Sequence, residues 1–536
     1  MIAAIAPSVR SRRVRAGYPE AGRRAARAES TATSSSCSAG VAGHQRIVNT
    51  LFTIRRERGP AMPTSLTPDD LRRLDALAIA DLVRRGELDR AEVTRTFASR
   101  IEAANPDLAA FVDIDPEAAL GGTEGQREGP LDGVPFAVKD IASYPGMRWA
   151  MGSRLFAANR GHEHTPHSRA VDEAGLVTLG KTATSELALL GSTETLLEGV
   201  TANPWKEGVS AAGSSGGAAA AVAAGLLPLA HASDGGGSIR VPASACGVFG
   251  FMPSNGRCQP AMPAAGGLGR LVVEHAVSRS VRDSAMLLAL TERTDETAPY
   301  DPIGFVDAAL DRSLRVATWR VTLGGHQPAR EVAEALDSAI ALLVALGHRV
   351  EETTPPAIDG RAASDAFFTL AGQSVDQVAT MMAPMLGREV GSDELEPFTL
   401  ELLDRYRGLP ADASDWADRV LGEAGSAYRS VFDDADVVVT PTMAIPPWPV
   451  GYLAPTLPYE TLVARTERAV GYTPIHNIAG CPAMSVPLSW SPDGLPIGVH
   501  VAARPGDDAL LLRLAYQLET ARPWRDRRPA NGSGDR

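Results

Sequence analysis

Two serines in glycine-rich segments and one lysine in an apolar segment are the residues best suited to covalent chemistry. Ser214 lies within a Gly-Ser-Ser-Gly-Gly segment, and Ser238 follows three consecutive glycines. Lys139 ends the apolar run Val-Pro-Phe-Ala-Val. A serine hydroxyl attacks a carbonyl group when a neighbouring base takes its proton, and a buried lysine that has lost its charge can be that base. The three residues together therefore indicate nucleophilic catalysis.

The glycines before Ser238 predict an anion-binding turn. Without side chains, the successive backbone N–H groups of Gly235, Gly236, Gly237 and Ser238 can converge on one point. We expect these groups to form an oxyanion hole for the negative oxygen that develops when a carbonyl is attacked. A flexible turn with an incidental serine is the alternative. The preceding Asp234 and a following Ile-Arg-Val-Pro-Ala segment argue against it.

Asp234 and Arg240 flank this turn and are expected to form an ion pair that holds it in place. His231 is the histidine nearest in sequence to Ser238. It ends a strand-like run, so we interpret it as a structural residue rather than as the base. Ser214 is expected to pass the proton between Ser238 and Lys139, because a hydroxyl both donates and accepts hydrogen bonds.

Lysine is scarce in this chain, which contains 49 arginines and only three lysines, at positions 139, 181 and 206. Arginine stays charged, whereas a buried lysine can lose its proton. The apolar neighbours of Lys139 predict a buried strand end, where the pKa of the amine falls towards the working pH. The alternative is a surface lysine paired with Asp140.

Composition excludes several classes of protein. A net charge of −12 argues against nucleic acid as a main partner. No apolar run has the length that a bilayer span requires. The four cysteines lie far apart and show no Cys-x-x-Cys spacing, so we expect a reducing compartment, a cytoplasmic location and no thiolate metal site.

Short apolar segments alternate with amphipathic ones, which predicts an α/β fold. We expect a single large mixed sheet covered by helices on both faces. The expected strands are 109–113, 136–138, 176–179, 314–318, 436–441, 483–487 and 498–502. The expected helices are 69–85, 90–104, 166–174, 216–227, 329–346 and 507–520, with a mostly helical region at 355–430.

Domain boundaries follow from the same pattern. Residues 1–62 are arginine-rich and are interpreted as disordered, or as an extension upstream of a natural start near Met62. Residues 63–525 form the expected catalytic domain, and 526–536 a frayed tail. The 355–430 region and the loop around 188–195 are expected to line the substrate pocket, with Ala188 and Gly213 as further substrate-binding candidates.

Two competing motifs are rejected. The segment from Gly175 to Thr182 matches the phosphate-loop pattern GxxxxGK[ST], but its intervening residues are apolar and β-prone, so we predict a strand. His162, His164 and His167 suggest a zinc site. We expect a solvated loop there, because Pro166 should prevent the helix that such a site needs.

The chain resembles the amidase signature family of amide hydrolases over residues 65–525. The matching segments occur in the family's order: 129–135, 180–186, 203–205, 213–217, 233–243, 246–250, 439–442 and 480–483. The resemblance implies that Ser238 is the nucleophile, Ser214 a bridging serine on a cis peptide bond, and Lys139 the base. The segments 230–234 and 278–283 resemble the branch that includes 6-aminohexanoate-cyclic-dimer hydrolases.

Five positions depart from the family pattern. Ser233 stands where threonine is usual, and Gly235 replaces a more usual Thr, Ala or Ile. The segment 250–253 reads Gly-Phe-Met-Pro rather than Gly-Leu-Lys-Pro, and Asn255 stands where Tyr or Arg is frequent. None of these changes removes Lys139, Ser214 or Ser238, so they bear on the substrate rather than on the chemistry.

The resemblance implies an amidase that hydrolyses the C–N bonds of linear carboxamides without a metal or organic cofactor. Aryl amides, cyclic oligoamides, carbamates and esters remain open as substrates. We expect a monomer or homodimer that binds neither nucleic acid nor membrane. One alternative is an A-type subunit that releases ammonia from glutamine in an aminoacyl-tRNA amidotransferase complex. A catalytically inactive scaffold is a third hypothesis, against which the intact set of Lys139, Ser214 and Ser238 argues.

Overall fold

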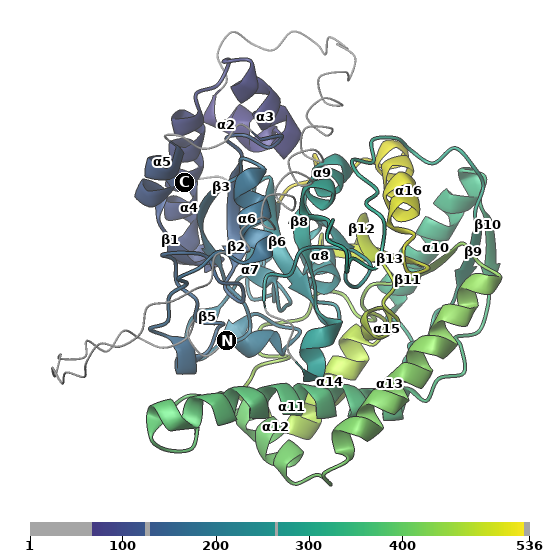
Figure 1. Cartoon of the computed structure of the whole chain (residues 1–536). Coiled ribbons are helices and arrows are strands. Elements are labelled where there is room, and N and C mark those ends of the chain that lie inside the picture. The colour runs from purple at the N-terminus through teal and green to yellow at the C-terminus, as the bar shows by residue number, and fades with distance from the viewer. Residues whose placement is uncertain (1–66, 124–128, 263–265, 530–536) are drawn as a thin grey trace, which may run out of the picture. The chain divides into compact units, whose positions relative to one another are not determined.

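The computed structural model describes residues 67–123, 129–262 and 266–529. Its largest sheet is mixed and has eight strands (Figure 1). Their order is β10 (Arg349–Glu352), β9 (Arg315–Thr318), β11 (Val437–Pro441), β13 (Pro496–Ala503), β12 (Ala483–Trp490), β7 (Phe249–Met252), β8 (Val273–Ser278) and β6 (Leu229–Asp234). The pairs β10–β9 and β9–β11 are parallel and the others antiparallel.

A three-stranded sheet adjoins this large sheet. Its order is β1 (Phe111–Ile114), β3 (Val177–Thr182) and β2 (Pro135–Lys139), and β2 packs against β6. A short hairpin, β4 (Glu194–Thr195) with β5 (Gly199–Val200), is separate in its hydrogen bonding. The predicted α/β class with a large mixed sheet is confirmed. Placing β2 beside β6 brings Lys139 close to the segment that carries Ser238.

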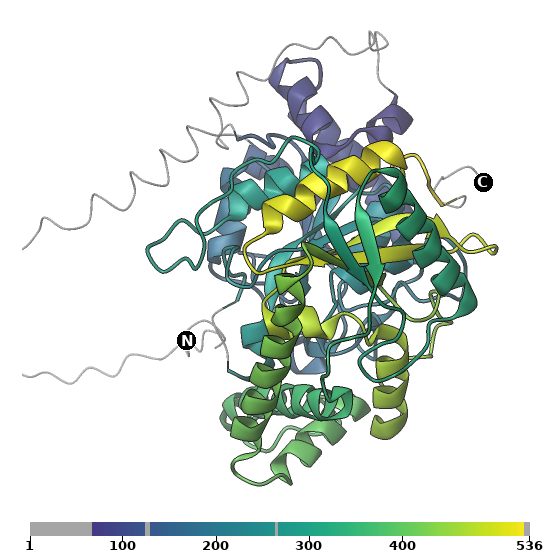
Figure 2. The same cartoon turned by 90° about the vertical axis from the view of Figure 1, so that its right-hand side faces the viewer.

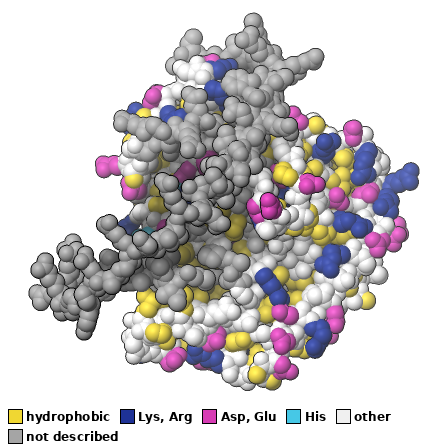
Figure 3. All heavy atoms as spheres, viewed as in Figure 1, with side chains coloured by type: hydrophobic (Ala, Val, Ile, Leu, Met, Phe, Trp, Pro, Cys, Tyr) yellow, Lys and Arg dark blue, Asp and Glu magenta, His cyan; other side chains and the backbone are white. Residues whose placement is uncertain are grey.

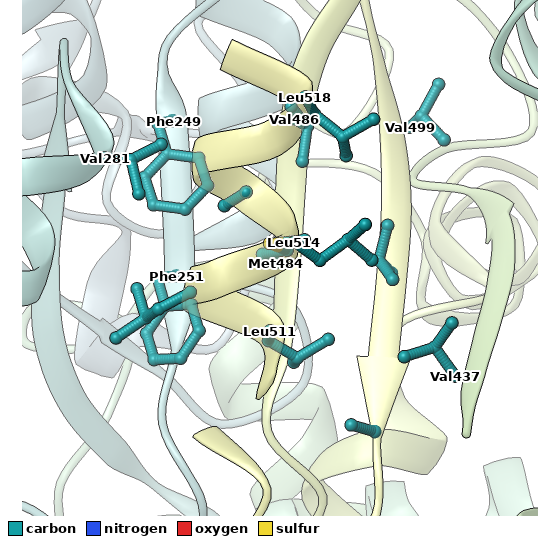
Figure 4. Close-up of a cluster of buried hydrophobic side chains, with 14 of the residues drawn as sticks. Phe249, Phe251, Val281, Val437, Met484, Val486, Val499, Leu511, Leu514 and Leu518 are labelled. Carbon is teal, nitrogen blue, oxygen red and sulfur yellow. The ribbon is translucent and has the colours of Figure 1, made fainter. Parts of the chain in front are cut away.

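Helices cover both faces of the large sheet, because alternate residues of each strand point to opposite sides. Val437 and Val439 of β11 pack into a core with α9 (Val281–Thr291), α10 (Arg330–Ala345) and α16 (Asp508–Ala521). Figure 4 shows Leu511, Leu514 and Leu518 of α16 in the same cluster as Phe249, Phe251 and Met484. Val438 faces the other way, into a core with α13 (Ala413–Arg429) and α15 (Pro474–Ala479).

The region 355–430 is helical, as predicted. It contains α11 (Gly360–Leu386), α12 (Pro397–Arg407) and α13, and α14 (Tyr459–Val470) contacts α12. Figures 1 and 2 both show α11 and α12 side by side, apart from the α16 face of the sheet. We refer to α11, α12 and α13 as the helical wall.

Further helices precede and connect the strands. They are α2 (Pro68–Arg73), α3 (Ala76–Arg84), α4 (Arg90–Leu108), α5 (Pro116–Thr123), α6 (Pro166–Glu173), α7 (Gly216–Ala223) and α8 (Arg240–Cys246), with 3₁₀ turns at 154–156, 186–188, 267–271 and 430–433. The helix expected at 69–85 is two helices, because the Asp75 side chain caps a new one by accepting from the Ala78 N–H. Helix α7 ends at Ala223 rather than at the predicted residue 227, because Gly225 adopts a φ of +73°.

Exposed charges are paired rather than segregated. Arg320, for example, contacts both Asp337 and Glu352. In Figure 3, basic and acidic side chains alternate over the described part of the face shown. Such exposed pairs contribute little to the stability of the fold, which depends mainly on the apolar cores.

Some expectations lie beyond these residues. The proposed extension at 1–62 falls outside the described residues, as does most of the tail at 526–536. Within the residues that are described, no helix combines the length and the apolar character needed to cross a bilayer.

Candidate active site

Lys139 ends β2 and is completely buried. Its Nζ donates to Ser214 Oγ at 2.7 Å and to Ser233 Oγ at 3.0 Å. The alternative of a surface lysine paired with Asp140 is wrong, since the Asp140 carboxylate lies 3.5 Å from Lys181 Nζ instead. The amine of Lys139 thus meets hydroxyls rather than a carboxylate.

Burial is the main electrostatic influence on this amine. Removal from water disfavours the ammonium and lowers the pKa of Lys139 to about 7, although Glu274 and Asp234 favour the charged form. A substantial fraction of the amine is therefore neutral near neutral pH, as a general base requires.

Ser214 lies just before α7, where a close backbone approach and a side-chain hydrogen bond hold the chain. The Gly213–Ser214 peptide bond is cis. A Cβ at Gly213 would lie 2.5 Å from the Ser192 carbonyl carbon and oxygen, so only glycine fits there. Thr193 Oγ1 donates to the carbonyl oxygen of Ser214 at 3.2 Å. Gly213, a substrate-binding candidate, is itself buried against Ser192.

Ser238 lies in the turn between β6 and α8 and is partly exposed. The backbone N–H of Ser215 donates to the carbonyl oxygen of Ser238 at 3.3 Å. The turn that carries Ser238 therefore lies directly against the residue that follows Ser214. The structure brings together three segments that are separated in the sequence.

Asp234 and Arg240 hold this turn, as predicted. Both side chains are fully buried, and two guanidinium N–H groups donate to the carboxylate, each at 2.9 Å. Burial acts to raise the pKa of Asp234, but Arg240 and the hydrogen bonds it accepts lower it to about 2. Asp234 is thus a permanent anion that also accepts from the Ile239 N–H at 3.0 Å.

One expected oxyanion donor has another partner. The Gly237 N–H donates to Asp234 Oδ1 at 2.6 Å, which corrects the expectation that it joins the oxyanion hole. Gly237 has a φ of +135°, and a Cβ there would lie 2.3 Å from Thr473 Oγ1. This glycine shapes the turn, and the donors that remain as candidates are Gly235, Gly236 and Ser238.

Several supporting residues gave no local signal in the sequence. Arg240 also donates to the Thr473 carbonyl oxygen and to Asn477 Oδ1, and Thr473 Oγ1 donates to the Gly236 carbonyl oxygen at 2.7 Å. These contacts link the turn to the segment that begins α15. Thr473 and Asn477 are more than 200 positions from Asp234, so no spacing rule could have indicated them.

The helical wall reaches the same turn through Phe367. A Cβ at Gly236 would lie 2.9 Å from Phe367 Cζ, so the ring of this partly exposed residue of α11 lies over the turn. The predicted pocket region 355–430 therefore contributes at least one side chain beside the site. Ala188, the other substrate-binding candidate, ends a 3₁₀ turn with a φ of +59° and is partly buried.

The phosphate-loop match is a strand, as predicted. Residues 177–182 form β3, which is buried throughout, and Lys181 donates to the Ala142 carbonyl oxygen.

The prediction that His162, His164 and His167 lie in a solvated loop is partly wrong. Pro166 is the first residue of α6, a position proline favours, and His167 is buried with its ring centroid 4.6 Å from that of His231. Within the described ranges, no cluster of three or more His, Cys, Asp or Glu residues could hold a metal ion.

Comparisons with known proteins agree with this geometry. The family model described as Amidase matches residues 92–512. A putative amidase, AmiC, of Mycobacterium tuberculosis is 38% identical over 465 residues, covering 85% of this chain and 96% of the relative. An acylamidase of Rhodococcus erythropolis is 33% identical over 484 residues, covering 87% and 99%. The solved structure of 6-aminohexanoate cyclic dimer hydrolase with substrate matches with a TM-score of 0.81 and 30% identity, covering 86% and 100%.

The chain therefore belongs to the amidase family and is a hydrolase that acts on carbon–nitrogen bonds. The resemblance inferred from the sequence motifs is confirmed, and cyclic-dimer hydrolases are among its relatives, as the segments 230–234 and 278–283 indicated.

Proposed function

We propose that this protein is an amidase that cleaves the C–N bond of small carboxamides through an acyl-enzyme on Ser238. The observation that carries the proposal is the 2.7 Å contact between the buried Lys139 amine and Ser214 Oγ. It supplies a base with a depressed pKa and a hydroxyl that relays a proton towards the turn of Ser238.

The proposed reaction has two halves. Ser238 Oγ bonds to the carbonyl carbon while its proton passes through Ser214 to Lys139, and the N–H groups of Gly235, Gly236 and Ser238 stabilise the oxyanion. The C–N bond then breaks as the proton returns to the departing amine. Water repeats the sequence on the ester, which releases the carboxylic acid and restores the enzyme.

Names of relatives guide the choice of substrate. The relatives reported above are called amidase, acylamidase and cyclic-dimer hydrolase, which favours an amidase over an amidotransferase subunit. The Phe367 ring beside Gly236 offers an apolar surface, so amides with an apolar or aryl group next to the scissile bond are the proposed class.

The decisive experiment combines labelling with product analysis. A fluorophosphonate probe should label wild-type protein at Ser238, and the Ser238→Ala variant should neither be labelled nor release amine from aryl and aliphatic amides. Wild-type-like turnover by Ser238→Ala would refute the mechanism. Carbamates and esters in the same panel define side activities. Glutaminase activity that appears only with partner chains would instead support the amidotransferase hypothesis.

A further inference from the structure

A carboxylate–histidine pair lies directly behind Lys139. The backbone N–H of Lys139 donates to His231 Nδ1 at 3.2 Å, and His231 Nε2 lies 2.9 Å from Glu274 Oε2. Burial lowers the pKa of His231 to about 3, so the ring is neutral. Because Nδ1 accepts, the ring proton is on Nε2, which donates to the carboxylate.

Strand pairing places Glu274 of β8 opposite a residue of β6 that contacts the Lys139 amine. In the β6–β8 ladder Glu274 lies opposite Ser233, whose Oγ accepts from Lys139 Nζ at 3.0 Å. Strand β6 therefore holds Lys139 at its backbone through His231 and at its amine through Ser233. Glu274 anchors His231 from β8 and is only 6% exposed.

The charge of Glu274 is less compensated than that of Asp234. Both favour the protonated amine of Lys139. Asp234, however, is neutralised by two hydrogen bonds from Arg240. Glu274 Oε2 meets a neutral imidazole. Burial has the largest influence on Glu274 and raises its pKa, while the positive charge of Lys139 opposes this shift, so the carboxylate is favoured in the state in which Lys139 is protonated.

Other titratable groups on the neighbouring elements lie near Lys139 or near the pair of His231 and Glu274. Besides Asp234, His231 and Glu274, these are His167 of α6, His275 of β8, Lys181 of β3 and Asp140 after β2. Burial lowers the pKa of both His167 and His275 to about 3, so neither changes charge near neutrality. Lys181 is paired with Asp140, so its titration must be measured separately from that of Lys139.

We propose that Glu274 is a positioning residue of the active site: through His231 it anchors the end of β2, and its negative charge stabilises the protonated amine of Lys139. This inference rests on the proposed role of Lys139 as the base. The ammonium forms when Lys139 takes the proton of Ser238, so a nearby carboxylate stabilises the state in which negative charge develops on the substrate oxygen. The same charge reduces the fraction of neutral amine at rest.

The scarcity of lysine makes a direct test practical. With lysine labelled by ¹³C at Cε, the full chain gives only three lysine signals; Lys206→Arg identifies the signal of the exposed residue and Lys181→Met that of Lys181, which leaves the signal of Lys139. Glu274→Gln removes the charge and keeps the shape. We expect it to lower the titration midpoint of Lys139 by about one pH unit, as loss of a nearby opposite charge should. Glu274→Asp should return the midpoint towards the wild-type value.

Chemical reactivity provides a second readout. The rate of fluorophosphonate labelling should rise with pH through the midpoint of Lys139, and Glu274→Gln should move this rise to lower pH by the same amount. Glu519→Gln is the matched control. It neutralises another carboxyl, which is partly buried and accepts from the Val281 N–H on α9, and an amide oxygen can accept that bond equally. The labelling profile should not move in this variant.

The possible failures are distinguishable. A Lys139 midpoint unchanged by Glu274→Gln overturns the role of Glu274 and leaves the proposed base intact. A wild-type midpoint near that of a free lysine overturns the proposed base itself. If Glu274→Gln does not fold, His231→Asn removes the donor to Glu274 while its amide oxygen can still accept from the Lys139 N–H. The Lys139 midpoint should fall here too, because an unbonded buried carboxylate is more readily protonated, and no fall would overturn the inference.

Discussion

Two buried lysines lie at or next to the ends of adjacent strands and contact different kinds of group. In the register of β2 with β3, Val138 lies opposite Lys181 and Lys139 opposite Thr182, and both amines are completely buried. Lys181 meets the carboxylate of Asp140 at 3.5 Å, whereas Lys139 meets the hydroxyls of Ser214 and Ser233. Burial lowers the pKa of Lys139 to about 7 and that of Lys181 to about 8, where Asp140 opposes the effect. The geometry, with two hydroxyls at one amine and a carboxylate at the other, therefore favours the proposed base role for Lys139 and a structural role for Lys181.

Removing the amine of Lys139 should have the largest effect on chemistry. We expect Lys139→Ala and Lys139→Arg both to lower kcat/KM by about 10³-fold, within the range for general bases, because arginine keeps its charge and cannot accept the proton. Amide turnover and fluorophosphonate labelling at fixed pH measure this loss. Labelling of Lys139→Arg at the wild-type rate would show that another group is the base.

Activity should also follow the protonation of Lys139. Since the neutral amine is the active form, kcat/KM should rise with pH, with a midpoint near the pKa of about 7. Below that midpoint it should fall by about tenfold per pH unit. A profile that is flat between pH values about two units either side of the midpoint, with chemistry rate-limiting, would contradict a titrating base.

Removing the amine of Lys181 should affect stability rather than chemistry. Lys181→Met leaves Asp140 buried without its cation, which we expect to lower the free energy of unfolding by about 3 kcal/mol. Denaturant unfolding measures the change, and kcat of the folded fraction should stay within a few-fold of wild type. The double variant Lys181→Met/Asp140→Asn should recover part of the loss. If kcat of Lys181→Met fell as far as that of Lys139→Ala, the two lysines would not have separate roles.

The smallest expected effect lies where the helical wall meets the turn. In Gly236→Ala the new Cβ would lie 2.9 Å from Phe367 Cζ, so the ring or the turn must shift. We expect a loss of about 1 kcal/mol in transition-state stabilisation, and Phe367→Ala should restore much of it in the double variant. A double-mutant cycle on kcat/KM tests this. Strictly additive effects would mean that the ring and the turn are not coupled.

The sequence predicted the class of fold because the spacing of apolar residues, and the residues that begin and end helices and strands, are local features. Several elements appear close to their predicted bounds, among them the apolar strands at 436–441 and 498–502 and the amphipathic helix at 507–520. The break between α2 and α3 was missed, since a side-chain cap at Asp75 outweighs a continuous amphipathic pattern. The helix predicted at 166–174 is present, but His167, expected in a solvated loop, lies within it and is buried, because proline favours the first helical position.

The same distinction holds for the candidate site. Residue types and short motifs by themselves determined that Lys139, Ser214 and the turn of Ser238 are the groups to bring together, since a glycine-rich turn or an isolated lysine carries its chemistry locally. Only the tertiary structure decided that Asp140 meets Lys181, that the Gly237 N–H is engaged by Asp234, and that His231 links Lys139 to Glu274. These contacts depend on strand register and on the packing of distant segments, and no local spacing in a chain specifies which buried partners will face each other.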